Sequence, residues 1–169
     1  MKYIKKLVIR LVLAVLLTLS YQLLYKILIP ITLYPSFYIL KLIYKAELSG
    51  TLITIDNYSL TFIPACAAAS AYILLGILIL LTKDIKLKTG IKMFLLGSLL
   101  ILLANIIRIE ALILILINGG KNYFETLHLF IWKVLSSIFV AAVWIFLIKL
   151  HKIKSIPIVS DIREIRKLM

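Results

Sequence analysis

Four long apolar stretches, separated by short polar segments, dominate the chain. They cover residues 7–29, 65–81, 91–117 and 124–150. Because about 20 apolar residues cross a hydrocarbon core of about 30 Å, each stretch is predicted to be a membrane-spanning helix. At about 1.5 Å per residue the third measures on the order of 40 Å, so it is expected to tilt or protrude. The pattern predicts an all-α integral membrane protein, a single domain built as a bundle of about four transmembrane helices.

A cleaved signal peptide is the alternative for the first stretch, because positive charges precede it. Its apolar run exceeds the length of about 7–15 residues that is usual for a signal peptide core, and no A-x-A cleavage motif follows. An uncleaved membrane anchor is therefore expected. Residues 31–45, rich in Tyr and Phe and interrupted by Pro35, are predicted to be an interfacial segment. A fifth, short spanning helix is the alternative for this segment.

Residues 46–63 alternate polar and apolar side chains with a period of two around Asp56 and Asn57. This pattern is typical of a short hairpin or a pair of extended segments. An open sheet edge leaves backbone groups unsatisfied in lipid, so the loop is placed outside the hydrocarbon. Pro64 is expected to open the second helix, since proline is favoured in a first helical turn. A turn is predicted at 118–122.

The charge distribution predicts the orientation. The chain has 169 residues, of which 63% are hydrophobic and 16% charged, with 20 basic against 7 acidic residues. These values exclude a soluble or disordered protein. The basic residues flank the apolar stretches, which predicts contact with membrane lipids and not with nucleic acid. They gather at the N-terminus, at 82–92 and in the tail 151–169, which are therefore expected to be cytoplasmic, whereas loop 46–63 has none.

This topology brings Cys66, Arg108 and His128 to the extracytoplasmic side of the bundle. A cysteine thiolate can attack a carbonyl, a histidine can protonate a leaving amine, and an arginine can stabilise an oxyanion. Pro64 would place Cys66 at a helix N-terminus, where the thiol pKa is lowered. Each residue also has a structural interpretation: Cys66 as a small apolar residue, Arg108 as a partner in an ion pair, and His128 as a solvated side chain at the interface.

Two neighbours are predicted to support this group. Ser70, four residues after Cys66, would face the same side of a helix, either to support the site or to pack against a neighbour. Asn105, three residues before Arg108, would orient Arg108 or form a hydrogen bond between helices. Glu110 would point away from Arg108, toward His128, a lysine or water. Small residues suited to close helix packing are Ala67, Ala71 and Gly76.

Several other kinds of site and function are excluded or disfavoured by the sequence, and two alternatives to an enzyme remain. One cysteine excludes an intramolecular disulfide, and neither zinc spacing nor a His-Glu-x-x-His motif occurs, so neither a metal nor a cofactor is expected. A serine intramembrane protease is disfavoured because Ser70 has no flanking glycines. The alternatives to an enzyme are a non-enzymatic membrane scaffold and a transport subunit in which Arg108 and Glu110 line a polar path.

Three segments carry a resemblance to a known family: residues 64–72 (PACAAASAY), 105–109 (NIIRI) and 127–132 (LHLFIW). Over about residues 46–148 the sequence resembles the exosortase/archaeosortase family of membrane-embedded cysteine transpeptidases. The Asn-x-x-Arg element is the most specific match. Many members follow the cysteine with Ser-Gly, where this chain has Ala67 and Ala68. The short length and the abundance of isoleucine and lysine resemble the archaeal branch.

The resemblance implies a catalytic triad of Cys66, Arg108 and His128 that acts as a cysteine peptidase and transpeptidase. It implies substrates that are exported proteins with a C-terminal sorting signal, composed of a short motif, a hydrophobic helix and a basic tail. Cleavage would occur near the extracytoplasmic face of the cell membrane. The cleaved protein would then pass to an acceptor, in some members a lipid.

Overall fold

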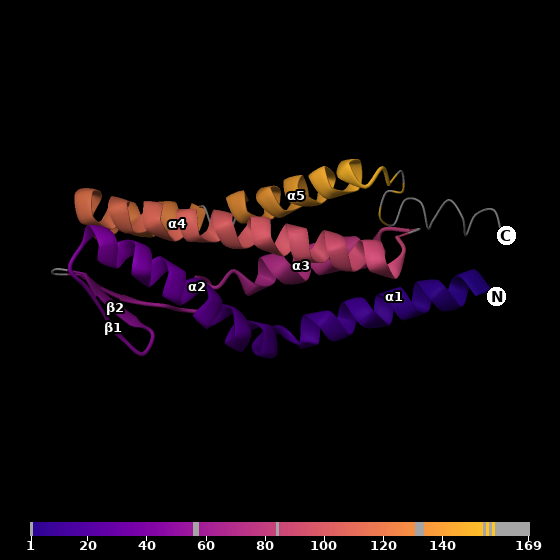
Figure 1. Cartoon of the computed structure of the whole chain (residues 1–169), viewed down its shortest axis with the longest axis horizontal. Coiled ribbons are helices and arrows are strands. Elements are labelled where there is room, and N and C mark those ends of the chain that lie inside the picture. Colours follow the sequence, from indigo (N-terminus) through magenta and orange to yellow (C-terminus); the bar gives the residue numbers. More distant parts are fainter. Residues whose placement is uncertain are drawn as a thin grey trace.

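The computed structural model describes residues 2–55, 58–83, 85–130, 134–153, 155 and 157. Its elements run along one long axis, with a small sheet at one end (Figure 1). We call the end that carries the sheet the sheet end. The opposite end, where α1 and α4 begin, is called the helical end. The elements are α1 (Lys2–Leu19), α2 (Tyr21–Ile43), β1 (Ala46–Ser49), β2 (Leu52–Ile55), β3 (Tyr58–Thr61), α3 (Ala69–Leu81), α4 (Leu87–Phe130) and α5 (Ser136–Leu150).

The first predicted helix, 7–29, is divided in the structure. The break lies at Ser20, where the hydroxyl donates to the Leu17 carbonyl oxygen at 2.7 Å, and the Thr18 hydroxyl donates to the Ala14 carbonyl at 2.9 Å. Such bonds compete with the helical backbone and favour a bend. The fold is mostly helical, but the predicted count of about four spanning helices is not confirmed. Among the described residues, α2 and the Leu87–Gly120 part of α4 are the two helices that are long and apolar enough to cross a membrane.

The segment 31–45 is the second difference, because α2 continues through Pro30 and Pro35 to Ile43. Each proline removes a backbone donor, which normally ends or kinks a helix. Here the inner face of α2 packs on the rest of the protein, with Leu33 and Leu40 almost completely buried. Tertiary packing of an apolar face supplies most of the stability of a helix in a protein, and it overrides the local cost of proline.

The loop 46–63 forms a three-stranded antiparallel sheet of order β1-β2-β3. The pairing of β2 with β3 across residues 56–57, themselves outside the described residues, confirms the predicted strand pair, and β1 adds a further strand. The all-α prediction is corrected accordingly. Ile53 and Ile55 are buried against side chains of α2 and α4, including Leu33 and Ile109.

The helix α4 reverses direction at Gly120, where φ is 78° and ψ is 176°. The evidence for the reversal is that Arg108 and His128 line the same cavity. Twenty residues of straight helix would instead separate them by about 30 Å. Glycine is suited to such a positive φ because it has no Cβ atom. The predicted turn at 118–122 is confirmed. The predicted helix 124–150 continues as the last part of α4 and as α5, with residues 131–133 outside the described residues.

The core of the helical end is closely packed around α3. Leu75 and Leu147 are fully buried there. A Cβ atom on Gly97 would lie 2.6 Å from Leu75 Cδ2 and 2.9 Å from Leu147 Cδ1, and one on Gly76 would lie 2.5 Å from Leu17 Cδ2. Gly76 thus allows α1 and α3 to approach closely, as predicted. Gly97 does the same between α4 and its neighbours α3 and α5.

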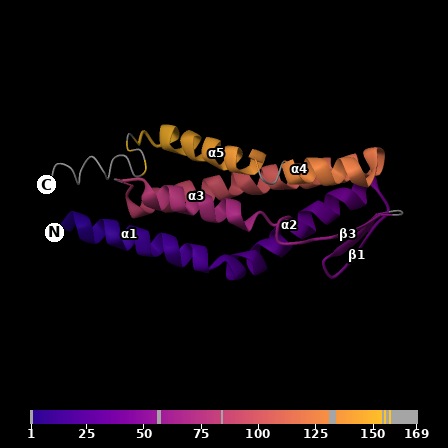
Figure 2. The same ribbon diagram turned by 180° about the vertical axis from the view of Figure 1, so that it is seen from behind.

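The α1 helix lies beside α3 in both views of the molecule (Figures 1 and 2). The Arg10 side chain fixes this arrangement, since it donates through Nε to the Leu80 carbonyl at 2.7 Å and through Nη2 to the Leu81 carbonyl. These carbonyls belong to the last turn of α3, where basic groups are favourable. α1 and α3 are therefore antiparallel, and the N-terminus lies at the helical end.

Candidate active site

Cys66 lies in a turn between β3 and α3. We call residues 63–68 the Cys66 turn; the Cys66 N–H donates to the Ile63 carbonyl at 2.9 Å and the Ala67 N–H to the Pro64 carbonyl at 3.2 Å. Ala68 adopts a left-handed conformation, with φ of 51° and ψ of 31°, which an α-helix cannot include. The helix predicted to start at residue 65 therefore starts at Ala69.

This later start changes the electrostatics that were expected for Cys66. The thiol precedes the helix, and the helix dipole acts mainly within the first turn. Burial raises the pKa of the Cys66 thiol above its usual value, whereas a backbone hydrogen bond with Ile63 and the positive charge of Arg108 act to lower it. The predicted low thiol pKa is wrong, because the net direction is upward. A neighbouring base is then needed to generate the thiolate.

Two side chains of α4 hold the Cys66 turn. Asn105 Nδ2 donates to the Cys66 carbonyl oxygen at 2.7 Å, and Arg108 Nη2 donates to the Ala65 carbonyl oxygen at 3.0 Å. Asn105 is only 5% exposed. Its amide thus contacts the Cys66 turn and not Arg108. Because the two residues are three positions apart on α4, they share one face and reach successive carbonyls of the turn.

The three predicted catalytic side chains line one cavity of about 250 Å³ between the sheet and α4. Among the described residues, no direct hydrogen bond joins Cys66, Arg108 and His128 to one another. The His128 ring packs edge-on against Phe124, with ring centroids 5.4 Å apart. The other residues that line this cavity are Ile53, Leu60, Thr61, Phe62, Ile63, Ile109, Leu112, Ile113 and Phe124.

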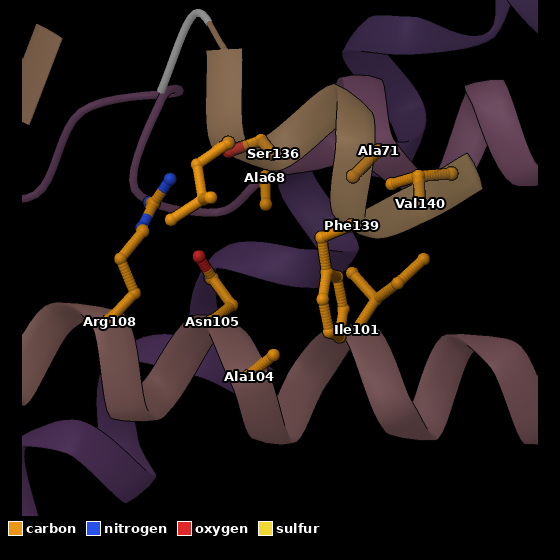
Figure 3. Close-up of a pocket in the computed structure, with 10 residues that line it drawn as sticks. Ala68, Ala71, Ile101, Ala104, Asn105, Arg108, Ser136, Phe139 and Val140 are labelled. Atoms are coloured by element: carbon orange, nitrogen blue, oxygen red, sulfur yellow. The ribbon is translucent and has the colours of Figure 1, made fainter. Parts of the chain in front are cut away.

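A second cavity, of about 140 Å³, also borders Arg108 (Figure 3). Figure 3 shows Arg108 and Asn105 rising from α4 toward Ala68 and Ser136. Arg108 lines both cavities. The Arg108 Nε atom is buried and has no hydrogen-bond partner among the described residues. The guanidinium therefore keeps a donor that is unused in this state.

Ser70 and Glu110 lie apart from this group. Ser70 is exposed and lines neither cavity, because the four-residue helical spacing from Cys66 does not apply when Cys66 precedes the helix. Glu110 also lines neither cavity, and its Oε1 atom is buried without a hydrogen-bond partner among the described residues. The predicted contacts of Glu110 with His128 or a lysine are not formed there.

The sequence analysis did not identify most of the residues that line the two cavities, among them Phe124 and Ser136. Phe124 precedes His128 by four positions, and this spacing alone could have identified it as a neighbour on the same helical face. Ser136 lines the second cavity from the first turn of α5, and no sequence signal distinguishes it from Ser137. The described residues contain no cluster of three His, Cys, Asp or Glu side chains that could bind a metal ion.

Comparisons with known proteins give one match. The family model of the transmembrane exosortases (Exosortase_EpsH) matches residues 1–149. No curated protein and no solved structure matches the chain. The matched region includes α1 to α4, the sheet and nearly all of α5, and therefore every residue of both cavities. The chain belongs to the transmembrane exosortase family.

Proposed function

We propose that this protein is a cysteine transpeptidase in which Cys66, Arg108 and His128 cleave the C-terminal sorting signal of exported proteins. Membership of the exosortase family supports the reaction class and the substrate class. The observation that carries the assignment of residues is the single cavity onto which the three side chains open. Sequence separations of 42 and 20 residues make this convergence a property of the tertiary fold.

The reaction begins at the scissile peptide bond of the sorting signal. Because the Cys66 thiol is protonated at rest, His128 removes its proton as Sγ attacks the carbonyl carbon. The oxygen becomes an oxyanion, which Arg108 stabilises through donors such as the unused Nε. His128 then returns the proton to the leaving nitrogen, the C–N bond breaks, and a thioester to Cys66 remains.

The second half of the reaction resolves the thioester. An acceptor amine, hydroxyl or water attacks the same carbonyl carbon, and His128 takes the proton of the acceptor. The C–S bond breaks, the thiolate recovers its proton from His128, and the exported protein leaves as an amide, ester or acid. A lipid that carries an amine or a hydroxyl fits this role.

The position of Arg108 along α4 supports a site at the membrane surface. It follows Leu87 by 21 residues, which corresponds to about 32 Å of helix. If Lys86 and Lys88 lie at the cytoplasmic surface, Arg108 reaches the outer boundary of a hydrocarbon core of about 30 Å. The sheet then lies beyond the hydrocarbon, where its open edges can be solvated. Both termini are cytoplasmic in this arrangement.

The test is processing in membranes. The protein is co-expressed with an exported protein that carries a C-terminal sorting signal from the same genome, as wild type and as Cys66→Ala, Arg108→Ala or His128→Ala. We expect each variant to lose cleavage at equal expression, and the wild type to carry a thioester on Cys66 that hydroxylamine releases. Ser70→Ala is the matched control, because Ser70 lies near Cys66 in sequence but lines neither cavity.

Mass spectrometry of the substrate and of the enzyme gives the result. Unchanged processing by the Cys66→Ala variant would remove the proposal, and Arg108 would then need a structural explanation. A transport path shared by Arg108 and Glu110, the alternative to catalysis, is not favoured, since Glu110 lines neither of the cavities beside Arg108.

A further inference from the structure

A polar cavity of about 490 Å³ lies at the helical end, far from the cavities beside Arg108. It forms where the connection that enters α4 meets the connection that leaves α5, two segments that come together at this end of the molecule (Figures 1 and 2). The residues that line it are Ile85, Lys86, Thr89, His151, Lys152, Ile153 and Ser155. The transpeptidase chemistry gives this cavity no role.

Apart from Ile85 and Ile153, the side chains that line the cavity carry hydrogen-bond donors or positive charges. Lys86 and Lys152 supply two ammonium groups, and Thr89 and Ser155 supply hydroxyl groups. The Nδ1 atom of His151 lies 3.0 Å from the Leu147 carbonyl oxygen, so Nε2 is the ring nitrogen left to meet a ligand. Among the described residues, no carboxylate lines the cavity. Ammonium and hydroxyl donors that converge in a concave site are suited to a phosphate group.

The backbone at this end is compatible with an anion. The last carbonyls of a helix normally repel negative charge. Here three of the last carbonyls of α5 already accept backbone hydrogen bonds. The His151 N–H donates to Leu147 at 3.0 Å, the Lys152 N–H to Lys149 at 3.1 Å and the Ile153 N–H to Ile148 at 2.9 Å. Lys152 makes this closure possible by adopting a positive φ of 52°.

We propose that this cavity binds a phosphate group, held by Lys86 and Lys152 with Thr89 as a hydroxyl donor. In the topology proposed above, the cavity lies at the cytoplasmic surface, where anionic phospholipids present phosphate at the same level. Soluble phosphate has the same chemistry, so both sources are tested. The proposal does not depend on Cys66 or on transpeptidation.

The experiment measures phosphatidylglycerol binding to the purified full-length protein in neutral detergent by native mass spectrometry. In the variant that combines Lys86→Gln with Lys152→Gln, we expect the affinity to fall about tenfold, since each lysine near anionic lipid contributes several-fold. The matched control combines Lys41→Gln with Lys45→Gln, which removes the same charge near the sheet end and is expected to leave binding unchanged. Thr89→Val keeps every charge and is expected to weaken binding.

A second titration uses inorganic phosphate without lipid, with thermal unfolding as the readout. Stabilisation of the wild type, absent in the Lys86→Gln, Lys152→Gln variant, would support the site and assign it to soluble phosphate. Lipid binding that depends on Lys86 and Lys152 without this stabilisation assigns it to a lipid headgroup. Equal loss of lipid binding in both double variants, or no loss in either, would overturn the proposal, because the lysines would then act only through net charge or not at all.

Discussion

The interior of the helical end and the region where α4 meets the Cys66 turn are built in opposite ways. In the helical end, Gly97 meets the fully buried Leu75 and Leu147, and Gly76 meets the half-buried Leu17, at distances where an added Cβ atom would force these leucines to shift. Around the Cys66 turn, two cavities remain open, and Asn105 and Arg108 add polar contacts to the turn beside the buried Ala67 and Ala68. The first region holds α4 by close packing, whereas the second leaves open space beside the unpartnered Nε of Arg108.

The two regions differ because burying polar side chains costs more free energy than burying apolar ones. A close-packed apolar core is stable without further partners. A buried arginine or asparagine is stable only when its hydrogen bonds are made, and Arg108 Nε is left without one. The region around the Cys66 turn is therefore expected to be the less stable of the two.

Of the four predictions, the largest effect is expected for Arg108→Lys. This variant tests the polar contacts around the Cys66 turn. Lysine keeps the positive charge but has no planar guanidinium. It therefore cannot donate to the Ala65 carbonyl and at the same time offer a second donor in the position of Arg108 Nε. Cleavage should fall about 100- to 1,000-fold, as for the loss of an oxyanion donor, with little change in folded protein. Single-turnover cleavage and thermal unfolding are measured together. Full activity in this variant would show that charge alone is sufficient.

Substitution of Gly97 tests the close packing of the helical end. The Cβ of a valine there would overlap Leu75 and Leu147, so Gly97→Val should lower the free energy of unfolding by about 1–3 kcal/mol. Gly90→Ala is the matched control, because a Cβ at Gly90 meets its nearest neighbour at an ordinary 3.4 Å. Thermal unfolding in detergent reports both. Equal stability of the two variants would contradict close packing at Gly97.

Asn105→Ala tests the polar side. It removes the donor to the Cys66 carbonyl and leaves that oxygen without its partner on α4, at a cost of about 1–2 kcal/mol. We also expect faster alkylation of Cys66 by iodoacetamide, because the Cys66 turn is less firmly held. Asn105→Asp, which keeps the shape but not the donor, should behave similarly. Wild-type alkylation rates in both variants would show that Asn105 does not hold the turn.

The smallest expected effect is a shift in the pH dependence of Cys66. Because its thiol pKa is raised, alkylation should increase with pH to a midpoint above that of free cysteine. Removing the positive charge in Arg108→Ala should move the midpoint further upward, since that charge favours the thiolate. Mass spectrometry of the alkylated protein at a series of pH values measures both. A midpoint below that of free cysteine would indicate a thiolate stabilised by other groups.

The sequence was sufficient for those features that depend on composition and local pattern. Apolar stretches of about 20 residues cross a bilayer as helices, because a helix satisfies its backbone hydrogen bonds internally, so the mostly helical membrane architecture followed from them. Gly120 marked the reversal of α4, and the alternation across 46–63 marked paired strands. The segments around Cys66, Arg108 and His128 identified the family, which the match over residues 1–149 confirmed. The archaeal affinity stays a prediction.

Only the tertiary structure decided the helix bounds and the contacts of the site. α2 passes through Pro30 and Pro35 because its buried face compensates for local propensity, which no short window of sequence reports. Ala68 ends the Cys66 turn in a left-handed conformation, so Cys66 lies before the helix and is not aligned with Ser70. Burial in the folded protein raises the pKa of the Cys66 thiol. Asn105 and Arg108 reach Cys66 and Ala65 across about 40 residues of chain. Such contacts depend on the packing of whole helices, which local sequence does not specify.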